Sequence, residues 1–419
     1  MPKLEVIPYG RQSIDEKDIR VVIDVLRSDW LTQGPKIKEF ESALCQYTGA
    51  KYAVVVSNGT AALHLACLAA GIGKGDRVIT SPITFAASAN SILYAGGTPV
   101  FIDVDQEIVN ISPEKIQHYI EHTNIKLNNK LKAIIPVHFA GYPCEMEKIY
   151  QIAKKYNLII IEDAAHALGA KYKINELTGS LVKEFNKKNK EKWIKIGSCQ
   201  HSNMTIFSFH PVKSITTGEG GAVLTNNKEL YEKLLMLRNH GITRNHKKFV
   251  NPLMRKSVNP LWYYEMQMLG FNYRITDIQA ALGISQLKKL DTFITKRHHI
   301  AQVYDKAFRC NPYFTIPTER EYLYSAYHLY QIRLNDKLMI QKTNIFRELI
   351  KQGIRTQVHY IPVYLHPYYQ QRNFKKGLCL QAEDFYKREI SLPIYPTLNI
   401  KQTKYIINNL LSICKKYNG

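Results

Sequence analysis

The sequence predicts an α/β protein with a large, mostly parallel sheet and a smaller second α/β domain. Short apolar runs rich in β-branched residues alternate with helix-like segments through the first two-thirds of the chain, and this alternation stops after Thr276. Apolar strands separated by helices are typical of a parallel sheet that is covered on both faces. A chain of 419 residues is long enough for one large domain and a smaller one.

Seven apolar runs predict the strands of the large sheet. They cover residues 53–57, 77–80, 99–103, 133–137, 158–162, 204–208 and 221–225. Between the third and fourth runs, Ser112 and Pro113 mark a helix start, with serine as the N-cap and proline at the first helical position. We expect these elements to form a large domain over residues 20–275.

A different pattern follows Thr276. Residues 277–308 predict a long helical stretch, with Leu282, Leu287 and Ile294 among its apolar positions. Beyond it, the expected elements are extended segments at 327–334 and 356–360 and a final helix near 403–416. We expect them to form a small C-terminal domain over 276–419, which also includes residues 1–19 and is joined by the long helix.

The charge of the chain is strongly basic, with 57 Lys and Arg against 35 Asp and Glu and a formal net charge of +22. Such a charge can attract nucleic acid or a membrane surface. The basic residues are spread along the chain, however, and no helix-turn-helix or zinc pattern accompanies them. We therefore expect neither partner. The one dense lysine cluster, at 183–195, predicts a solvated insertion.

The seven cysteines are scattered and form no C-x-x-C pair, which disfavours a metal site and a disulfide framework. No apolar run approaches membrane-spanning length, and the first residues do not resemble a signal peptide. We expect a cytoplasmic protein without a metal.

Lys213 is the most informative single residue. It lies in a short polar loop between two apolar runs, within the stretch SFHPVKSITTGEGG at 208–221. Most lysines of the chain must be solvated, and a lysine amine is a useful nucleophile only when burial or a neighbouring charge lowers its pKa. In this loop Lys213 is a candidate for covalent attachment to an aldehyde.

Asp163 strengthens that interpretation because it follows an apolar strand, and ligands of open α/β sheets bind at the carboxyl ends of the strands. A lysine for the aldehyde and an aspartate for the pyridinium nitrogen are the groups that pyridoxal phosphate needs most. The alternative role of Asp163 is a helix N-cap. His166 can hydrogen-bond the phenolic oxygen of the ring, or be a satisfied core or surface histidine.

Four more residues suit the same cofactor. Gly59 and Thr60 lie between a strand and a helix, where free amides and the helix dipole favour a phosphate, although Asn-Gly-Thr is also a routine turn. Ser208, at a strand end, can donate to the same phosphate. Phe85 follows the second strand and can stack on a flat ring, or simply pack in the core.

Six stretches resemble the DegT/DnrJ/EryC1/StrS sugar aminotransferases and occur in that family's order. They are SNGTAALHLA (57–66), SPITFAASAN (81–90), VHFAG (137–141), IEDAAHALGA (161–170), FSFHPVKSITTGEGGAVLT (207–225) and GFNYRITDIQAALG (270–283). The resemblance runs from about Pro8 to the C-terminus. It implies fold type I of the PLP-dependent transferases, the aspartate aminotransferase-like fold, with a seven-stranded large domain. The lysine-rich segment near 171–195 is longer than the family's usual link.

The resemblance also implies roles. Lys213 would bind the cofactor and move the proton, and Asp163 would pair with the pyridinium nitrogen. The other cofactor residues implied are Gly59, Thr60, Phe85, His166, Ser208 and Asn272. Asn272 resembles a residue that reaches a phosphate across a dimer interface, which implies a homodimer with shared sites. His359 and Tyr360 resemble a segment bordering the sugar-nucleotide pocket, and His210 is a further candidate substrate residue.

Within the family, residues 197–217 and 353–369 resemble the branch that serves pseudaminic acid biosynthesis. This implies transfer of the amino group of L-glutamate to C4 of a UDP-linked 4-keto-6-deoxy-N-acetylhexose. Lys213 favours transamination, because a dehydrating branch of the family carries histidine there. The alternatives are another dTDP- or UDP-linked C3- or C4-ketosugar, or a non-catalytic regulatory or binding member of the family.

Overall fold

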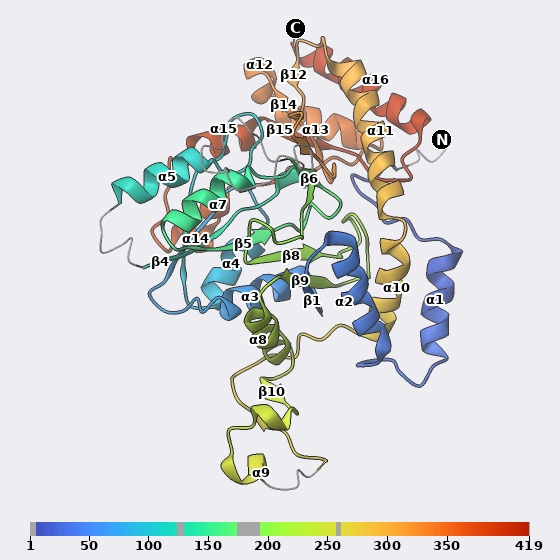
Figure 1. The fold of residues 1–419 in the computed structure, drawn as a ribbon. Helices are drawn as coiled ribbons and strands as arrows, with labels where there is room; N and C mark the ends of the chain where they lie inside the picture. The colour runs from blue at the N-terminus through green and yellow to red at the C-terminus, as the bar shows by residue number, and fades with distance from the viewer. Residues whose placement is uncertain (1–5, 124–129, 174–192, 257–260, 419) are drawn as a thin grey trace, which may run out of the picture.

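The computed structural model describes residues 6–123, 130–173, 193–256 and 261–418. At its centre is a seven-stranded sheet of order β1-β9-β8-β5-β4-β2-β3 (Figure 1). Its strands are β1 (Tyr52–Val56), β2 (Arg77–Thr80), β3 (Thr98–Phe101), β4 (Leu131–Ile135), β5 (Ile159–Asp163), β8 (Met204–Ser208) and β9 (Gly221–Thr225). Only β9 runs antiparallel to its neighbours, so the predicted mostly parallel sheet is confirmed.

Helices cover both faces of this sheet. Successive residues of β1 enter different cores: Val55 packs in one cluster with Phe40, and Val54 packs in the other with Leu65. The first cluster takes residues from α2 (Pro35–Thr48), α5 (Pro113–His122), α7 (Met146–Lys155) and α10 (Asp277–Leu287). The second takes residues from α3 (Gly59–Ala69), α4 (Ala87–Tyr94) and α8 (Lys228–Arg238). Ser112 caps α5 as predicted, accepting from the Lys115 N–H.

The predicted long helical stretch 277–308 is wrong in one respect, because it forms two helices. Helix α10 packs beside α2 and α1 (Glu16–Leu26), and α11 (Leu290–Phe308) begins after a break at Lys288 and Lys289. The first turns of α11 contact the core of the large sheet, and its last turns contact a second core (Figure 1). At the break, Lys289 pairs with the buried Asp18 of α1.

The second core surrounds a three-stranded sheet of order β12-β14-β15. Its strands are β12 (Phe314–Thr315), β14 (Tyr330–Leu334) and β15 (Glu389–Leu392), accompanied by α12 (Asp336–Met339), α13 (Lys342–Lys351), α15 (Leu380–Arg388) and α16 (Ile400–Asn418). The final helix was expected. The extended segment 327–334 starts as a strand only at Tyr330, since Tyr327 has a φ of 44°. Residues 356–360 form no strand but a single bridge, Gln357 with Ser391.

Short elements complete the chain. They are η1 (Phe139–Gly141), η4 (Val363–Leu365), α14 (Pro367–Gln370) and a small sheet of order β13-β6-β7, with β6 (Lys171–Tyr172), β7 (Ile194–Lys195) and β13 (Leu323–Tyr324). The two ends of the predicted insertion, β6 and β7, thus pair with each other, and β6 also pairs with β13. Most of the lysine cluster lies outside the described residues.

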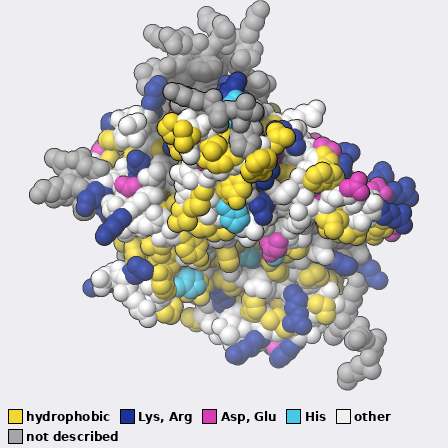
Figure 2. Space-filling view, turned by 90° about the horizontal axis from the view of Figure 1, so that it is seen from below, with side chains coloured by type: hydrophobic (Ala, Val, Ile, Leu, Met, Phe, Trp, Pro, Cys, Tyr) yellow, Lys and Arg dark blue, Asp and Glu magenta, His cyan; other side chains and the backbone are white. Residues whose placement is uncertain are grey.

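An arm projects from the large sheet between α8 and α10 (Figure 1). It contains β10 (Ile242–Thr243), η3 (His246–Lys248), α9 (Pro252–Lys256) and β11 (Glu265–Met266). Figure 2 views this end of the molecule and shows hydrophobic side chains gathered on it. The exposed ones include Val250, Leu253, Leu261, Trp262, Met266 and Leu269, with Leu261 98% exposed. Within the described ranges, no helix combines the length and apolarity needed to span a bilayer.

Candidate active site

Lys213 and Asp163 meet at the carboxyl ends of two neighbouring parallel strands. Asp163 is the last residue of β5, and Lys213 follows β8, which pairs with β5 in parallel register. Both side chains line one cavity of about 790 Å³. Burial lowers the pKa of Lys213 to about 8, and the nearby Asp163 opposes that shift. The lysine therefore has the lowered pKa that a nucleophilic amine needs near neutral pH.

Asp163 is held by two donors. The Ser88 hydroxyl donates to Oδ2 at 2.6 Å, and the Ala165 N–H donates to Oδ1 at 3.2 Å. Ser88 is in turn 2.6 Å from the Thr84 hydroxyl. Burial raises the pKa of Asp163, and these donors act against that rise. The helix-cap alternative is wrong, because turns and not a helix follow β5.

Glu162, beside Asp163, points away from the cavity into a separate buried network. His138 Nε2 lies 2.9 Å from its Oε2, and Thr205 and Ser202 donate to its Oε1. His138 Nδ1 accepts from the Cys144 N–H, so its Nε2 carries the proton that is given to Glu162. Glu162 therefore anchors the end of β5, and Asp163 is the carboxylate left for a ligand.

An anion cradle lies at the start of α3. Asn58 caps the helix by accepting from the Ala61 N–H, and Gly59 is the first helical residue. A Cβ on Gly59 would lie 2.9 Å from Ser208 Cβ, so glycine permits the close approach of β8 to the helix start. Gly59, Thr60 and Ser208 all line the cavity. Free amides at a helix start, with two hydroxyls beside them, suit a phosphate.

Buried histidines form the opposite wall. His166 Nε2 lies 3.3 Å from the Tyr360 hydroxyl, and its ring is 4.2 Å from the ring of His328. The Nδ1 atoms of both histidines are buried without a hydrogen-bond partner among the described residues. Burial lowers the pKa of each well below the usual value. Both rings are therefore neutral, and each offers a polar atom to a ligand.

The structure gathers most of the predicted site residues in this one cavity. Phe85, His210, His359 and Tyr360 line it, in addition to those already described. Phe85 is 62% exposed, and its ring lies 6.3 Å from that of Tyr360. Asn272 does not line the cavity; its backbone forms a bridge with Asn239 at the base of the projecting arm.

Sequence reasoning missed several lining residues: Tyr9, Tyr94, Glu219, Tyr273 and His328. The only available signal for His328 was a histidine in the apolar run that leads into β14. Its partner His166 is far away along the chain, so the pairing comes from tertiary structure alone. Tyr9 reaches the site because the N-terminal segment pairs with residues near 354, and its ring packs 5.5 Å from that of His359.

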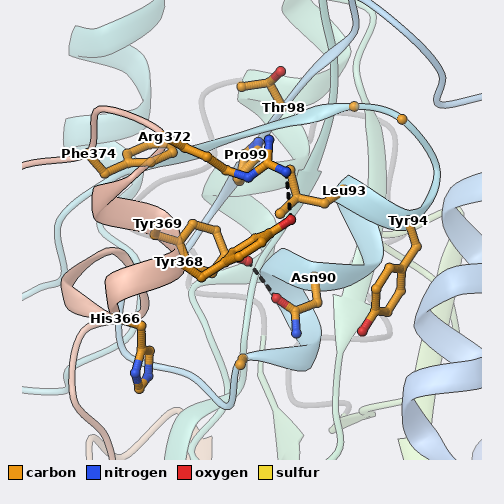
Figure 3. Close-up of a pocket in the computed structure, with 13 residues that line it drawn as sticks. Asn90, Leu93, Tyr94, Thr98, Pro99, His366, Tyr368, Tyr369, Arg372 and Phe374 are labelled. Carbon is orange, nitrogen blue, oxygen red and sulfur yellow. Dashed lines mark hydrogen bonds between the residues drawn. The ribbon is translucent and has the colours of Figure 1, made fainter.

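A second cavity, of about 850 Å³, adjoins the first and shares Tyr94 with it. Figure 3 shows it between α4 and the segment around α14, where Arg372 donates to the Tyr368 hydroxyl at 2.6 Å and Tyr369 donates to Asn90 at 2.7 Å. Of these two cavities, Lys213 and Asp163 line only the first. The chemistry is therefore assigned to that one.

The residues of the first cavity fit pyridoxal phosphate. The amine of Lys213, with its lowered pKa, suits the aldehyde of the cofactor. The start of α3 at Gly59, with the hydroxyls beside it, suits the phosphate, and the buried carboxylate of Asp163 suits the ring nitrogen. The unpartnered Nδ1 atoms of His166 and His328 add polar contacts for a ring substituent or a substrate.

Comparisons with known proteins agree with this geometry. The model of the DegT/DnrJ/EryC1/StrS aminotransferase family matches residues 12–411. The chain is 40% identical to the UDP-4-amino-4,6-dideoxy-N-acetyl-beta-L-altrosamine transaminase of Campylobacter jejuni serotype O:2, over 98% of each chain.

Two solved structures are also similar. Helicobacter pylori PseC, an aminotransferase involved in pseudaminic acid biosynthesis, superposes with a TM-score of 0.85 at 35% identity, over 99% of this chain and 100% of that one. A Streptococcus pneumoniae protein described as a sugar aminotransferase and solved in its PLP form has a TM-score of 0.83 at 29% identity, over 98% and 99% of the two chains. The chain therefore belongs to the DegT/DnrJ/EryC1/StrS aminotransferase family, and its fold is that of the PLP-dependent aminotransferases.

Proposed function

We propose that this aminotransferase binds pyridoxal phosphate and transfers the amino group of L-glutamate to C4 of UDP-2-acetamido-2,6-dideoxy-beta-L-arabino-hex-4-ulose. The observation that carries the chemistry is the buried pair of Lys213 and Asp163 in one cavity. The choice of sugar rests on the Campylobacter and Helicobacter relatives, which carry that transaminase name at 36–41% identity.

Each residue of the cavity has a proposed task. Lys213 would hold the cofactor through its aldehyde, and its amine would move the proton at the reacting carbon. Asp163 would keep the ring nitrogen protonated, and pyridoxal phosphate, when bound, would supply an electron sink. Gly59, Thr60 and Ser208 hold the phosphate. The lowered pKa of Lys213, about 8, keeps a useful share of its amine neutral near physiological pH.

The substrate side of the cavity is formed by neutral, hydrogen-bonding groups. His166, His328 and His359 all have pKa values lowered by burial, so they orient a substrate without adding charge. Phe85 packs against a flat ring from the exposed side. We assign His210, His359 and Tyr360 to substrate contacts, since they line the cavity beyond the lysine–aspartate pair.

A homodimer with shared sites forms part of the proposal. The projecting arm exposes apolar side chains that a partner subunit would cover, among them Leu261 and Trp262, 98% and 82% exposed. We assign Asn272, at the base of that arm, to the other subunit's phosphate site, as the family resemblance implies. All seven cysteines are free, which fits the reducing cytoplasm we propose for this protein.

A panel of half-reactions tests the substrate assignment. The enzyme loaded with pyridoxal phosphate is mixed with single amino acids, and the aminated enzyme with UDP- and dTDP-linked 3-keto and 4-keto sugars, while the cofactor's absorbance is followed. The proposal is supported if L-glutamate rapidly converts the cofactor to its aminated form and only the UDP-linked 4-keto-6-deoxy sugar converts it back. If a dTDP-linked or 3-keto sugar converts the cofactor back instead, that sugar replaces the proposed substrate, but the reaction class stays the same.

A further inference from the structure

His359 is connected to two buried polar side chains that the reaction described above does not use. Its Nδ1 lies 2.8 Å from Ser391 Oγ, and Ser391 Oγ lies 2.5 Å from Glu389 Oε1. The backbone N–H of His359 donates to Glu389 Oε2 at 2.9 Å. Glu389 and Ser391 are fully buried in β15, whereas His359 lines the cavity that holds Lys213. The chain of contacts thus runs from the core of the small sheet to the substrate cavity.

The direction of these hydrogen bonds depends on one proton. An ionised Glu389 can only accept, so the single hydroxyl proton of Ser391 points to it and Ser391 must accept from Nδ1–H of His359. The neutral ring then has a bare Nε2. A neutral Glu389 donates from Oε1 to Ser391, which donates to Nδ1, and the ring proton sits on Nε2. The net charge of His359 is the same in both cases.

The surroundings of Glu389 make both states accessible. Arg333 lies opposite it in the β14–β15 register and favours the carboxylate. Lys342 favours the carboxylate from α13 while it is charged, but burial lowers the pKa of Lys342 itself, so the two groups titrate together. Burial favours the neutral acid and raises the pKa of Glu389 to about 8. The other titratable groups near it are His359, whose own pKa is lowered to about 3 by burial, and Tyr360, whose pKa is raised mainly by burial.

We infer that Glu389 determines, through Ser391, whether His359 presents a hydrogen-bond acceptor or a donor to the substrate cavity. With the carboxylate, Nε2 accepts from an ammonium or hydroxyl of the substrate. With the neutral acid, Nε2 donates to a substrate oxygen. Glu389 and Ser391 are positioning residues in this scheme. The role toward substrate rests on the proposed function, but the tautomer is a property of the resting protein.

Magic-angle-spinning NMR of the holoenzyme labelled with ¹⁵N-histidine tests the tautomer, since protonated and bare ring nitrogens have separate signals. The variant His359→Gln identifies the signals of His359 by their loss. In the wild type, we expect Nε2–H below pH about 8 and Nδ1–H above it. In Glu389→Gln, the side-chain carbonyl must accept the His359 N–H, so the amide donates to Ser391 and Nε2–H persists at every pH.

A matched control is Glu383→Gln. Glu383 is also buried and also accepts from a hydroxyl and a backbone N–H, those of Tyr364 and Gly377, but it does not contact His359. The Glu383→Gln variant should still show the pH-dependent tautomer change of His359. Ser391→Ala should abolish the change and Ser391→Thr should restore it. The inference is overturned if His359 has the same tautomer below and above pH about 8 in the wild type, and the same one again in Glu389→Gln.

The two half-reactions, measured separately, identify the substrate group involved. If it is the ammonium of the amino donor, Glu389→Gln lowers kcat/KM for L-glutamate about tenfold above pH about 8, where the wild type presents a bare Nε2 but the variant still presents Nε2–H, so that two donors face each other. If it is a group of the sugar, the loss appears with the ketosugar. A changed tautomer with neither half-reaction affected refutes the substrate role. A changed tautomer in an enzyme that aminates no sugar refutes the proposed function and keeps the relay.

Discussion

The hydroxyl of Ser88 donates to Oδ2 of Asp163 at 2.6 Å, and both groups are buried. Ser88 lies in the first turn of α4 and Asp163 ends β5, so one hydrogen bond ties the helix after β2 to the carboxylate proposed for the cofactor nitrogen. Because this bond favours the ionised form of a buried acid, it keeps Asp163 in the state that the chemistry requires.

Removing that hydroxyl should slow the enzyme without removing the cofactor. Ser88→Ala deletes a donor to a charged acceptor, a contact worth about 1.5–3 kcal/mol, and so we expect kcat to fall roughly ten- to a hundredfold. Ser88→Thr keeps the donor and should retain more activity than the alanine variant. Steady-state kinetics measure both. Equal activity in wild type and Ser88→Ala would show that Asp163 needs no such support.

Lys213→Ala should abolish turnover. The amine both attaches the cofactor and moves the proton, and loss of a general acid–base group alone costs roughly 10²–10⁴-fold. The absorbance band of lysine-bound cofactor should disappear as well. Lys36→Ala, which removes a surface lysine paired with Glu39, is the control and should leave both unchanged. Wild-type turnover by Lys213→Ala would refute the assignment.

The pH dependence of cofactor capture should report Lys213. Its pKa in the folded protein is about 8, below the ordinary value, so the reactive neutral amine is scarce below pH 8 and abundant above it. The rate at which apoenzyme captures pyridoxal phosphate should therefore rise through pH about 8 and then level off. Asp163 raises the pKa of Lys213. In Asp163→Asn the midpoint should thus move to lower pH; an unchanged or higher midpoint contradicts the coupling.

Gly59→Ala should weaken cofactor binding. The added Cβ would meet Ser208 Cβ at 2.9 Å and so would separate the two elements that form the phosphate cradle. We expect the Kd for pyridoxal phosphate to rise about tenfold, the loss of one good hydrogen bond to a charged group. Gly73→Ala is the matched control, because nothing lies within 4 Å of its Cβ position. Fluorescence titration measures the affinity of both variants for pyridoxal phosphate. Equal affinities would show that the close approach at Gly59 does not form the phosphate site.

Charges on the arm should dissociate the proposed dimer. Leu261→Glu and Trp262→Glu place carboxylates on apolar, exposed positions that a partner would bury. Sedimentation should then show monomers, with loss of activity if the sites are shared. Ile340→Glu alters an equally exposed residue beside α12, 77% exposed, and should leave the dimer intact. A dimer that survives both Leu261→Glu and Trp262→Glu would place the interface elsewhere.

The sequence predicts the large sheet well because its strands contain continuous apolar runs, buried on both faces, such as residues 158–161. Prediction from the sequence fails where tertiary contacts determine the local secondary structure. The break at Lys288 and Lys289 falls within one unbroken apolar pattern, since Leu287 before it and Leu290 after it pack in the same core. Residues 356–360 have strand-like composition, yet they make only the bridge to Ser391, because the segment turns toward the cavity with His359.

The same distinction holds for the site. Residues within motifs next to strand ends, such as Asp163 and Lys213, were identifiable from local sequence. His328 and Tyr9 were not, because only folding brings them beside His166 and His359. The relay from Glu389 was equally hidden, since its alternating residues Glu389 and Ser391 look like ordinary positions of a short strand.

Product analysis tests the central claim most directly. The holoenzyme is incubated with L-glutamate and UDP-2-acetamido-2,6-dideoxy-beta-L-arabino-hex-4-ulose, and the product is analysed by NMR, with Lys213→Ala as the blank. The account predicts a C4 amine on the UDP-sugar and an equal amount of 2-oxoglutarate. An enzyme that converts its cofactor with glutamate but leaves this sugar's C4 carbonyl intact would contradict it.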